Sequence, residues 1–206
     1  MKVFKFGGAS VRSAEGIRNI QQIVTQNTDD LFIVISAMGK TTNAMEEVLA
    51  FFMAGKRTEA HAKLTEVEAY HIEIIDALFD DKAIGRAAIA DVFAELNSYI
   101  DNGLPTDYDR CYDYLVSFGE VISTKIISEY LNFSGVQNVW LDMRKLLVTD
   151  SNFREANVRM DESERRLSMA ANFATSKIYI GQGFIGTNMS GDATTLGREG
   201  SDYTAA

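Results

Sequence analysis

The chain has 206 residues, of which 46% are hydrophobic and 24% charged, ordinary values for a globular domain that buries its own core. Its net charge of −9, without a basic stripe, disfavours nucleic acid as a partner. No apolar run reaches the length of a membrane span, the single Cys111 excludes an internal disulfide framework, and no secretion leader follows Met1, so we expect a cytoplasmic protein.

The first elements alternate between strand and helix. Lys2 to Phe6 alternates in polarity like a strand and stops at Gly7-Gly8, after which Ser13 is placed to cap a helix. The continuously apolar run Leu31 to Ile35 predicts a strand covered on both faces, and hence a parallel sheet with helices on either side. A second helix is expected to begin at a capping box formed by Asn43 and Glu46.

The middle of the chain is helical in composition. Between residues 58 and 102, the lone Gly85 predicts a break between two helices. His61 and His71 are too far apart for a metal-binding pair, so we expect surface or internally satisfied histidines and no metal site. A further helix is expected to begin near Glu120, whose charge suits a helix start.

The last third continues the alternation. Val139 to Leu141 predicts a buried strand, Leu146 to Thr149 a short strand, and Asp161 with Glu164 a capping box, before Lys177 opens another strand. No repeat or linker marks a domain boundary. The pattern predicts one α/β domain with a doubly wound, mainly parallel sheet and helices on both faces.

The stretch from Lys177 to Ala206 contains six glycines within twenty residues. Packing alone does not require them, whereas close backbone contact with a ligand does. The same stretch carries the donors and acids of an anion site, namely Thr194, Thr195, Ser201, Arg198, Asp192 and Asp202. A mobile surface loop is the alternative. The order of strand, glycine-rich loop and a helix capped by Ser201 favours a site.

Two familiar nucleotide motifs fail. Gly39-Lys40-Thr41 ends like a P-loop, but Val34 stands where the first glycine of that motif is required. Gly181 to Gly186 matches the dinucleotide fingerprint and follows a strand, but the polar run Thr187 to Gly200 replaces the long helix that should come next.

Five segments place glycines or polar groups at strand ends or helix starts, and in a doubly wound sheet such ends meet in one crevice. These segments are Lys5 to Val11, Ser36 to Met38, Ser117 to Glu120, Gly183 to Gly186 and Thr194 to Asp202. Together they resemble the aspartate kinases of the amino acid kinase family over the whole chain. The family motif KFGGTSV reads KFGGASV here, with Ala9 for threonine, and TTLGRGGSD reads TTLGREGSD, with Glu199 for glycine.

The resemblance implies transfer of the γ-phosphoryl group of ATP, with Mg²⁺, to the side-chain carboxylate of L-aspartate. Lys5 would neutralise charge on the transferring phosphoryl oxygens, and Asp202 would hold Lys5 or orient magnesium-bound waters. Gly7, Gly8, Ala9 and Gly183 would approach the nucleotide. Implied substrate contacts are Arg198 to the α-carboxylate, Glu120 to the ammonium, and hydroxyls of Ser36, Thr42 and Ser201.

Two alternatives stay open. One is another amino acid kinase with a different acceptor, and the other is a binding or assembly fragment without turnover. Related kinases continue through an adenine-binding region and regulatory domains for end-product amino acids, and they imply a homo-oligomer at full length. We therefore expect residues 1 to 206 to be the N-terminal portion of a kinase domain that binds aspartate weakly and does not turn over ATP alone.

Overall fold

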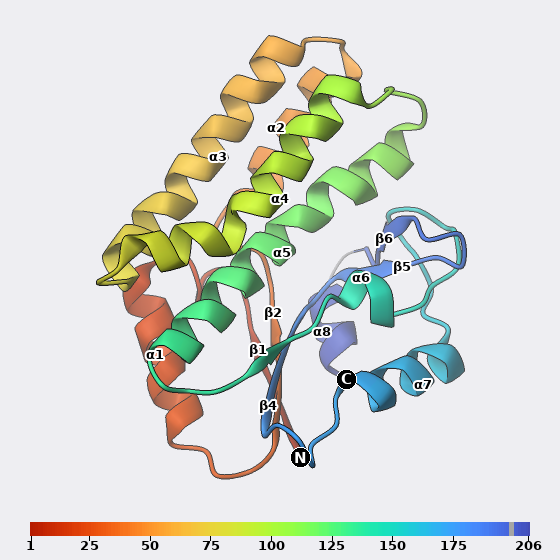
Figure 1. Ribbon diagram of the computed structural model, residues 1–206. Coiled ribbons are helices and arrows are strands. Elements are labelled where there is room, and N and C mark those ends of the chain that lie inside the picture. The colour runs from red at the N-terminus through yellow and green to blue at the C-terminus, as the bar shows by residue number, and fades with distance from the viewer. Residues whose placement is uncertain (198–199) are drawn as a thin grey trace.

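A parallel sheet of four strands lies between two groups of helices in the computed structural model, which describes residues 1–197 and 200–206 (Figure 1). The strand order is β1-β2-β4-β3, and every neighbouring pair is parallel. The strands are β1 (Lys2–Phe6), β2 (Leu31–Ile35), β3 (Val139–Trp140) and β4 (Ile178–Gln182). The predicted α/β fold with a parallel sheet is confirmed.

The burial of each strand follows its place in the sheet. β2 and β4 are central, and nearly all of their side chains are buried, as the unbroken apolar run of β2 predicts. β1 lies at an edge and keeps an alternating pattern of exposure. In the register of the sheet, Phe6 pairs with Ile35 and Ile35 pairs with Gln182, so the carboxyl ends of three strands are level.

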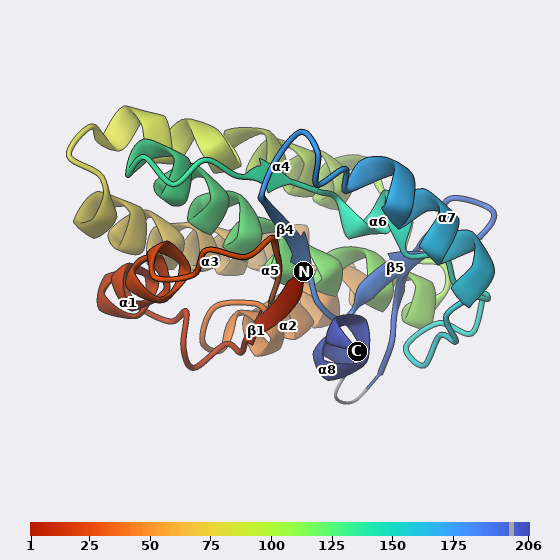
Figure 2. The same cartoon turned by 90° about the horizontal axis from the view of Figure 1, so that it is seen from below.

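The helices cover both faces of the sheet, as Figure 2 shows from below. On one side lie α1 (Ala14–Thr25), α2 (Thr41–Met53), α3 (Arg57–Leu78), α4 (Lys82–Asn102) and α5 (Tyr108–Phe133). On the other side lie α6 (Met143–Leu146), α7 (Met160–Ala170) and α8 (Gly200–Ala205). An antiparallel hairpin of β5 (Ile185–Thr187) and β6 (Ala193–Thr195) packs against α5.

One of the four predicted helix caps is present, and the Ser201 cap is described with the site below. Ser13 caps α1 by accepting a hydrogen bond from the Gly16 amide at 3.2 Å. The capping box of Asn43 and Glu46 is wrong, because a turn with positive φ at Gly39 starts α2 already at Thr41. The box of Asp161 and Glu164 is also wrong, since α7 begins at Met160 without a side-chain cap.

The helices α4 and α5 start earlier than the sequence predicts. Gly85 lies inside α4, which Asp81 caps. A larger residue does not fit at this position, because the side chains of Ile75 and Phe79, at the end of α3, occupy the space beside it. α5 is capped by Asp107 and runs for 26 residues, so Glu120 lies in mid-helix and not at a helix start.

Two predicted strands differ in the structure. Val139–Trp140 is an edge strand, and Val139 is exposed rather than buried. The segment predicted as a strand from Leu146 begins as the end of α6, and only Val148 and Thr149 make isolated bridges. Asp142 caps α6 by accepting from the Arg144 amide, a local bond that outweighs the apolar pattern.

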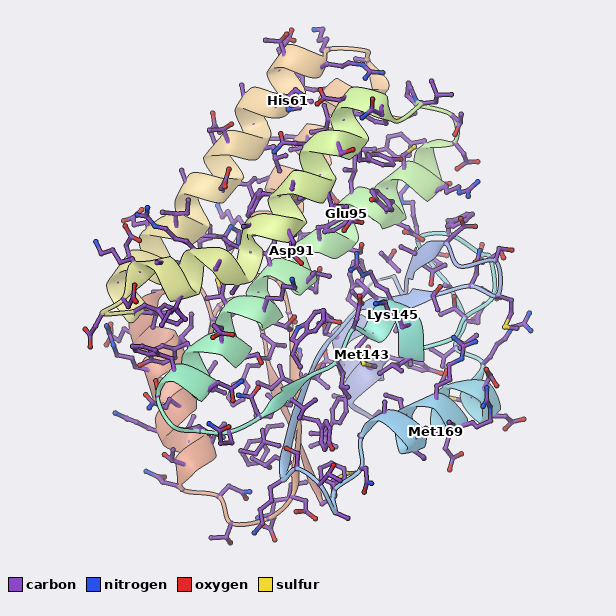
Figure 3. The ribbon with its side chains drawn as sticks, in the orientation of Figure 1. His61, Asp91, Glu95, Met143, Lys145 and Met169 are labelled. Carbon is purple, nitrogen blue, oxygen red and sulfur yellow. The ribbon has the colours of Figure 1, made fainter. Side chains whose placement is uncertain are left out.

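The two histidines are internally satisfied, as predicted. His71 is buried, bonds the Val67 carbonyl through Nδ1 at 2.7 Å, and has its pKa lowered to about 4 by burial. His61 contacts Asn97 and Asp101 at the end of α3 that is distant from the sheet (Figure 3). Cys111 is buried and accepts a hydrogen bond from Tyr99. Within the described residues, no helix combines the length and apolarity needed to cross a bilayer.

Replacing Gly85 by alanine should destabilise the protein by about 1–3 kcal/mol, although alanine is the better helix former by about 1 kcal/mol. A Cβ at this position would lie 2.6 Å from Ile75 Cγ2 and 2.7 Å from Phe79 Cδ2, and both side chains are buried. Denaturant unfolding measures the change. Ala87→Gly, at an exposed position of the same helix, should cost only about 1 kcal/mol. A Gly85→Ala protein at least as stable as the parent would contradict the close packing.

Candidate functional site

The level carboxyl ends of β1, β2 and β4 open into one pocket of about 350 Å³. Parallel strands direct the loops that follow them to the same edge of the sheet, and α5 and α8 complete the walls. The described lining residues are Lys5, Gly7, Gly8, Ser36, Thr42, Glu120, Phe184, Gly197, Gly200, Ser201 and Asp202. The structure thus brings together residues from segments that lie far apart in the sequence.

Lys5 and Asp202 form an ion pair at the mouth of this pocket. The Lys5 Nζ lies 2.7 Å from Asp202 Oδ1, and the two side chains are 31% and 62% exposed. A pair this accessible to water contributes about 1 kcal/mol or less to stability. Its effect on the site is therefore geometric, because it holds the lysine of β1 against α8.

Close backbone approaches tie the loops of the pocket together. A Cβ on Gly183 would lie 2.6 Å from the Ser201 Cβ, so only glycine lets α8 pack on the end of β4. A Cβ on Gly8 would lie 2.6 Å from the Ala37 carbonyl oxygen, which fixes the β1 loop against the β2 loop in the same way. The Ser36 hydroxyl donates to the Ser201 hydroxyl at 3.0 Å across this junction.

Glu120 is the buried acid of the pocket. Its side chain comes from the middle of α5, and its Oε1 accepts a hydrogen bond from the Ala37 amide at 3.2 Å. Its Oε2 is buried and has no hydrogen-bond partner within the described part of the chain. Burial raises the pKa of Glu120 to about 8, and the Ala37 amide only partly offsets this effect. Such a group gains a strong interaction when a cation reaches it.

Not every predicted site residue lies in this pocket. Ala9 lines a different cavity, between the start of α2 and α3, because the chain turns away from the sheet after Gly8. Ser201 does line the pocket, but it is the second residue of α8 and therefore not the predicted cap before the helix. Arg198 and Glu199 lie outside the described residues.

Phe184 lines the pocket, although the sequence gives it no role beyond its place in the segment Gly183 to Gly186. Its φ is 71°, a value that side chains other than glycine rarely adopt. The Phe184 amide donates to the Thr204 hydroxyl at 3.1 Å, and its carbonyl accepts from the Leu196 amide at 2.9 Å, so both sides of the strained residue are held. Its place between Gly183 and the hairpin is the only sequence signal, and it is a weak one.

The two rejected motifs have other structural roles. Gly181 to Gly186 runs from β4 into β5 instead of into a helix. Gly181 leaves room for Met143 of α6, whose Sδ would lie 2.9 Å from an added Cβ and which lies near β4 in Figure 3. Val34 is a buried residue of β2, and Gly39 is the turn before α2.

The described residues contain no group of three or more His, Cys, Asp or Glu side chains that could hold a metal ion. In the pocket, Asp202 and Glu120 are the described carboxylates, and Asp202 is paired with Lys5. With so few carboxylates, the pocket fits a Mg²⁺ ion whose ligands are mostly phosphate oxygens of the substrate and water molecules, which is the usual way that Mg²⁺ is bound beside phosphates.

Comparison with known proteins agrees with this geometry. A family model described as the amino acid kinase family matches residues 1–206. The chain is 31% identical over 212 residues to lysine-sensitive aspartokinase 3 of Escherichia coli (strain K12). This match covers 99% of the chain and 45% of that protein. Two crystal structures of Escherichia coli aspartokinase III are each 29% identical to this chain, and each match covers all of this chain and 45% of the aspartokinase chain. One, in complex with lysine and aspartate, gives a TM-score of 0.88, and the other, with aspartate and ADP, gives 0.86.

The chain therefore spans less than half the length of these relatives. The match nevertheless covers every strand that lines the pocket, because it includes residues 1–206. By its sequence, its fold and the residues gathered at the strand ends, the chain belongs to the amino acid kinase family.

Proposed function

We propose that the protein containing this chain is an aspartate kinase, which transfers the γ-phosphoryl group of ATP to the side-chain carboxylate of L-aspartate to give 4-phospho-L-aspartate. The proposal depends most on one observation. The buried Glu120 Oε2, which has no hydrogen-bond partner among the described residues, shares one small pocket with the Lys5 ammonium. The first group suits the cation of an amino acid, and the second suits a phosphoryl group.

The amino acid end of the substrate is assigned to Glu120 and its neighbours. The ammonium of aspartate would complete the buried carboxylate, and the hydroxyls of Ser36, Thr42 and Ser201 would bond the rest of the molecule. By the family motif, Arg198 would bind the α-carboxylate. A relative solved with aspartate and ADP supports aspartate as the acceptor.

The phosphoryl end is assigned to Lys5. In phosphoryl transfer most of the catalysis is positioning and charge stabilisation, and an ammonium held in place serves both. Gly7 and Gly8 lack side chains that would block the approach of phosphate oxygens to the backbone. A bound Mg²⁺ would neutralise charge on the phosphate oxygens, with Asp202 contacting it or its waters. Ala9 and Gly183 were assigned to the nucleotide by the same motifs, but Ala9 lines another cavity.

The nucleophile needs no general base. The side-chain carboxylate of aspartate is already ionised at neutral pH, so the site has only to align it with the phosphorus atom. This accounts for a pocket whose described polar side chains are hydroxyls, the Lys5 ammonium with its partner Asp202, and one acid, Glu120, that is proposed to bind the ammonium. Contacts to adenine and any response to end-product amino acids are proposed to lie in other parts of the protein that contains this chain.

The natural protein that contains the chain should form acyl phosphate from ATP and L-aspartate, which hydroxylamine traps as aspartyl hydroxamate. Glutamate, N-acetylglutamate and carbamate should react at least about a hundredfold more slowly, since a misplaced acceptor loses the alignment. The same assay on residues 1–206 should give no turnover. Trapping with another acceptor but not with aspartate would replace the proposed substrate, and equal rates for the two proteins would show that the nucleotide site is complete within the chain.

Lys5→Ala in the natural protein should lower kcat by about a hundredfold or more, the usual loss for one preorganised electrostatic donor. Steady-state kinetics with saturating ATP and aspartate measures the effect. Lys2→Ala is the matched control, because Lys2 lies on the same strand but pairs with Asp29 at the opposite end. A kcat for Lys5→Ala within a few-fold of that of Lys2→Ala would reject the role of Lys5.

Aspartate binding at pH 7 should release close to one proton. With its pKa raised to about 8, Glu120 is mainly protonated at pH 7 before binding, and an arriving ammonium favours the carboxylate and displaces that proton. Calorimetry in two buffers of different ionisation enthalpy counts the protons. Glu120→Gln should bind aspartate at least tenfold more weakly and release none. Heats that do not depend on the buffer in the parent protein would contradict an ammonium contact at Glu120.

A further inference from the structure

Asp113 is a buried acid of α5 that has no place in the proposed chemistry. Its carboxylate accepts three hydrogen bonds from two other segments. The Thr195 hydroxyl donates to Oδ1 at 2.6 Å, the Thr195 amide donates to Oδ2 at 3.0 Å, and the Arg154 amide donates to Oδ2 at 3.0 Å. The side chain is fully buried. No ion pair joins its carboxylate to a cation among the described residues, and backbone and hydroxyl donors satisfy it instead.

These donors lie beside Gly197, which lines the pocket. Thr195 ends β6, and Gly197, two positions later, lines the pocket. Gly197 has φ of 74° and lies so near the Arg154 carbonyl that an added Cβ would stand 3.1 Å from that oxygen. The Ala156 amide also bonds the Thr195 carbonyl at 2.9 Å. Asp113 therefore binds both chain segments between which Gly197 is placed.

Asp113 and Glu120 share one rigid element. They are about two turns apart on α5, which runs along the β5-β6 hairpin in Figure 1. One acid points into the pocket, and the other holds the strand that leads into the pocket loop. The distance between Glu120 and Gly197 is thus set by a helix and by three hydrogen bonds.

We propose that Asp113 is a positioning residue, which holds Gly197 of the pocket in place relative to Glu120 through its bonds to Thr195 and Arg154. The inference rests on the proposed function, because it assigns Glu120 to the ammonium end of the substrate. When these bonds are lost, Gly197 can move away from Glu120, and the pocket loses the form that binds the amino acid.

A purely structural role fits the observations less well. A buried carboxylate without a cation is costly, and an apolar residue of the same size would stabilise a hairpin interface at lower cost. What the apolar residue would not do is bind the Thr195 and Arg154 amides at defined positions. An acid at position 113 is therefore better explained by the placement of these two amides than by stabilisation of the hairpin interface.

The test compares Asp113→Asn with Asp109→Asn in the natural protein. Asparagine has nearly the same shape, but its side-chain NH₂ group is a donor and would face the Thr195 or Arg154 groups that donate to Asp113. Asp109 lies one turn earlier and pairs with the exposed Arg154 guanidinium, not with backbone, so its variant is the control. Asp113→Asn should raise KM for aspartate about tenfold or more and change KM for ATP less than about threefold. Asp109→Asn should change none of these.

Hydrogen exchange gives a readout that needs no catalysis. In Asp113→Asn, the amides of residues 193–197 should exchange about tenfold faster or more than in Asp109→Asn, while those of β2 should not change. If Asp113→Asn does not fold, Thr195→Val removes the hydroxyl bond alone and should show the same changes at smaller size. Unchanged exchange and unchanged KM for aspartate would overturn the proposal. Faster exchange in a protein whose parent forms no acyl phosphate would instead reject the proposed function and keep the positioning role.

Discussion

The parallel register of β1, β2 and β4 is the constraint on which the rest of the structure depends. Because Phe6, Ile35 and Gln182 are paired across the sheet, the loops that follow them begin at one level and share one pocket. The glycines of these loops then act as spacers. Gly8 admits the Ala37 carbonyl and Gly183 admits Ser201, so the pocket can be narrow enough for a small amino acid and a phosphoryl group. A residue with a side chain at either position would separate the loops before it disturbed the sheet.

Helix α5 supplies the second constraint, because it contacts the sheet, the hairpin and the helices α2 and α4. A long helix buried on most sides is a poor place for acids, yet it holds Asp113 and Glu120, both buried. The two acids are satisfied differently. Donors surround Asp113, whereas Glu120 keeps one oxygen without a described partner. In the proposed function, this difference separates an acid that positions a loop from one that binds the substrate ammonium. Burial raises the pKa of Asp113 to about 6 and that of Glu120 to about 8.

Much of the fold could be predicted from the sequence, because strand burial leaves a direct pattern. Alternation in Lys2–Phe6 fits an edge strand, and the unbroken apolar run Leu31–Ile35 fits a central one. Helix starts were less predictable. Those of α2, α4 and α5 depend on the Gly39 turn and on the Asp81 and Asp107 caps, none of which is a hydrophobic pattern. Eight of the predicted site residues line the pocket, and because they could be named only from a family resemblance, their roles remain predictions. Phe184 and Asp113 depend on backbone strain and tertiary hydrogen bonds, which have no sequence signature.

The hydroxyl contact between Ser36 and Ser201 joins positions that are 165 residues apart in the chain. Together with the pairing of β2 to β4, it makes the topology strongly non-local, and non-local contacts form slowly because a long loop must close first. During synthesis β2 can pair with β1 early, but its other edge stays open until β4 has emerged. The sequence of that edge, Leu31–Ile35, is apolar throughout, which is a hazard for association with other chains. The rapid assembly of the helices α2 to α5, whose contacts are local, would cover one face of the strand during this interval and leave only its edge exposed.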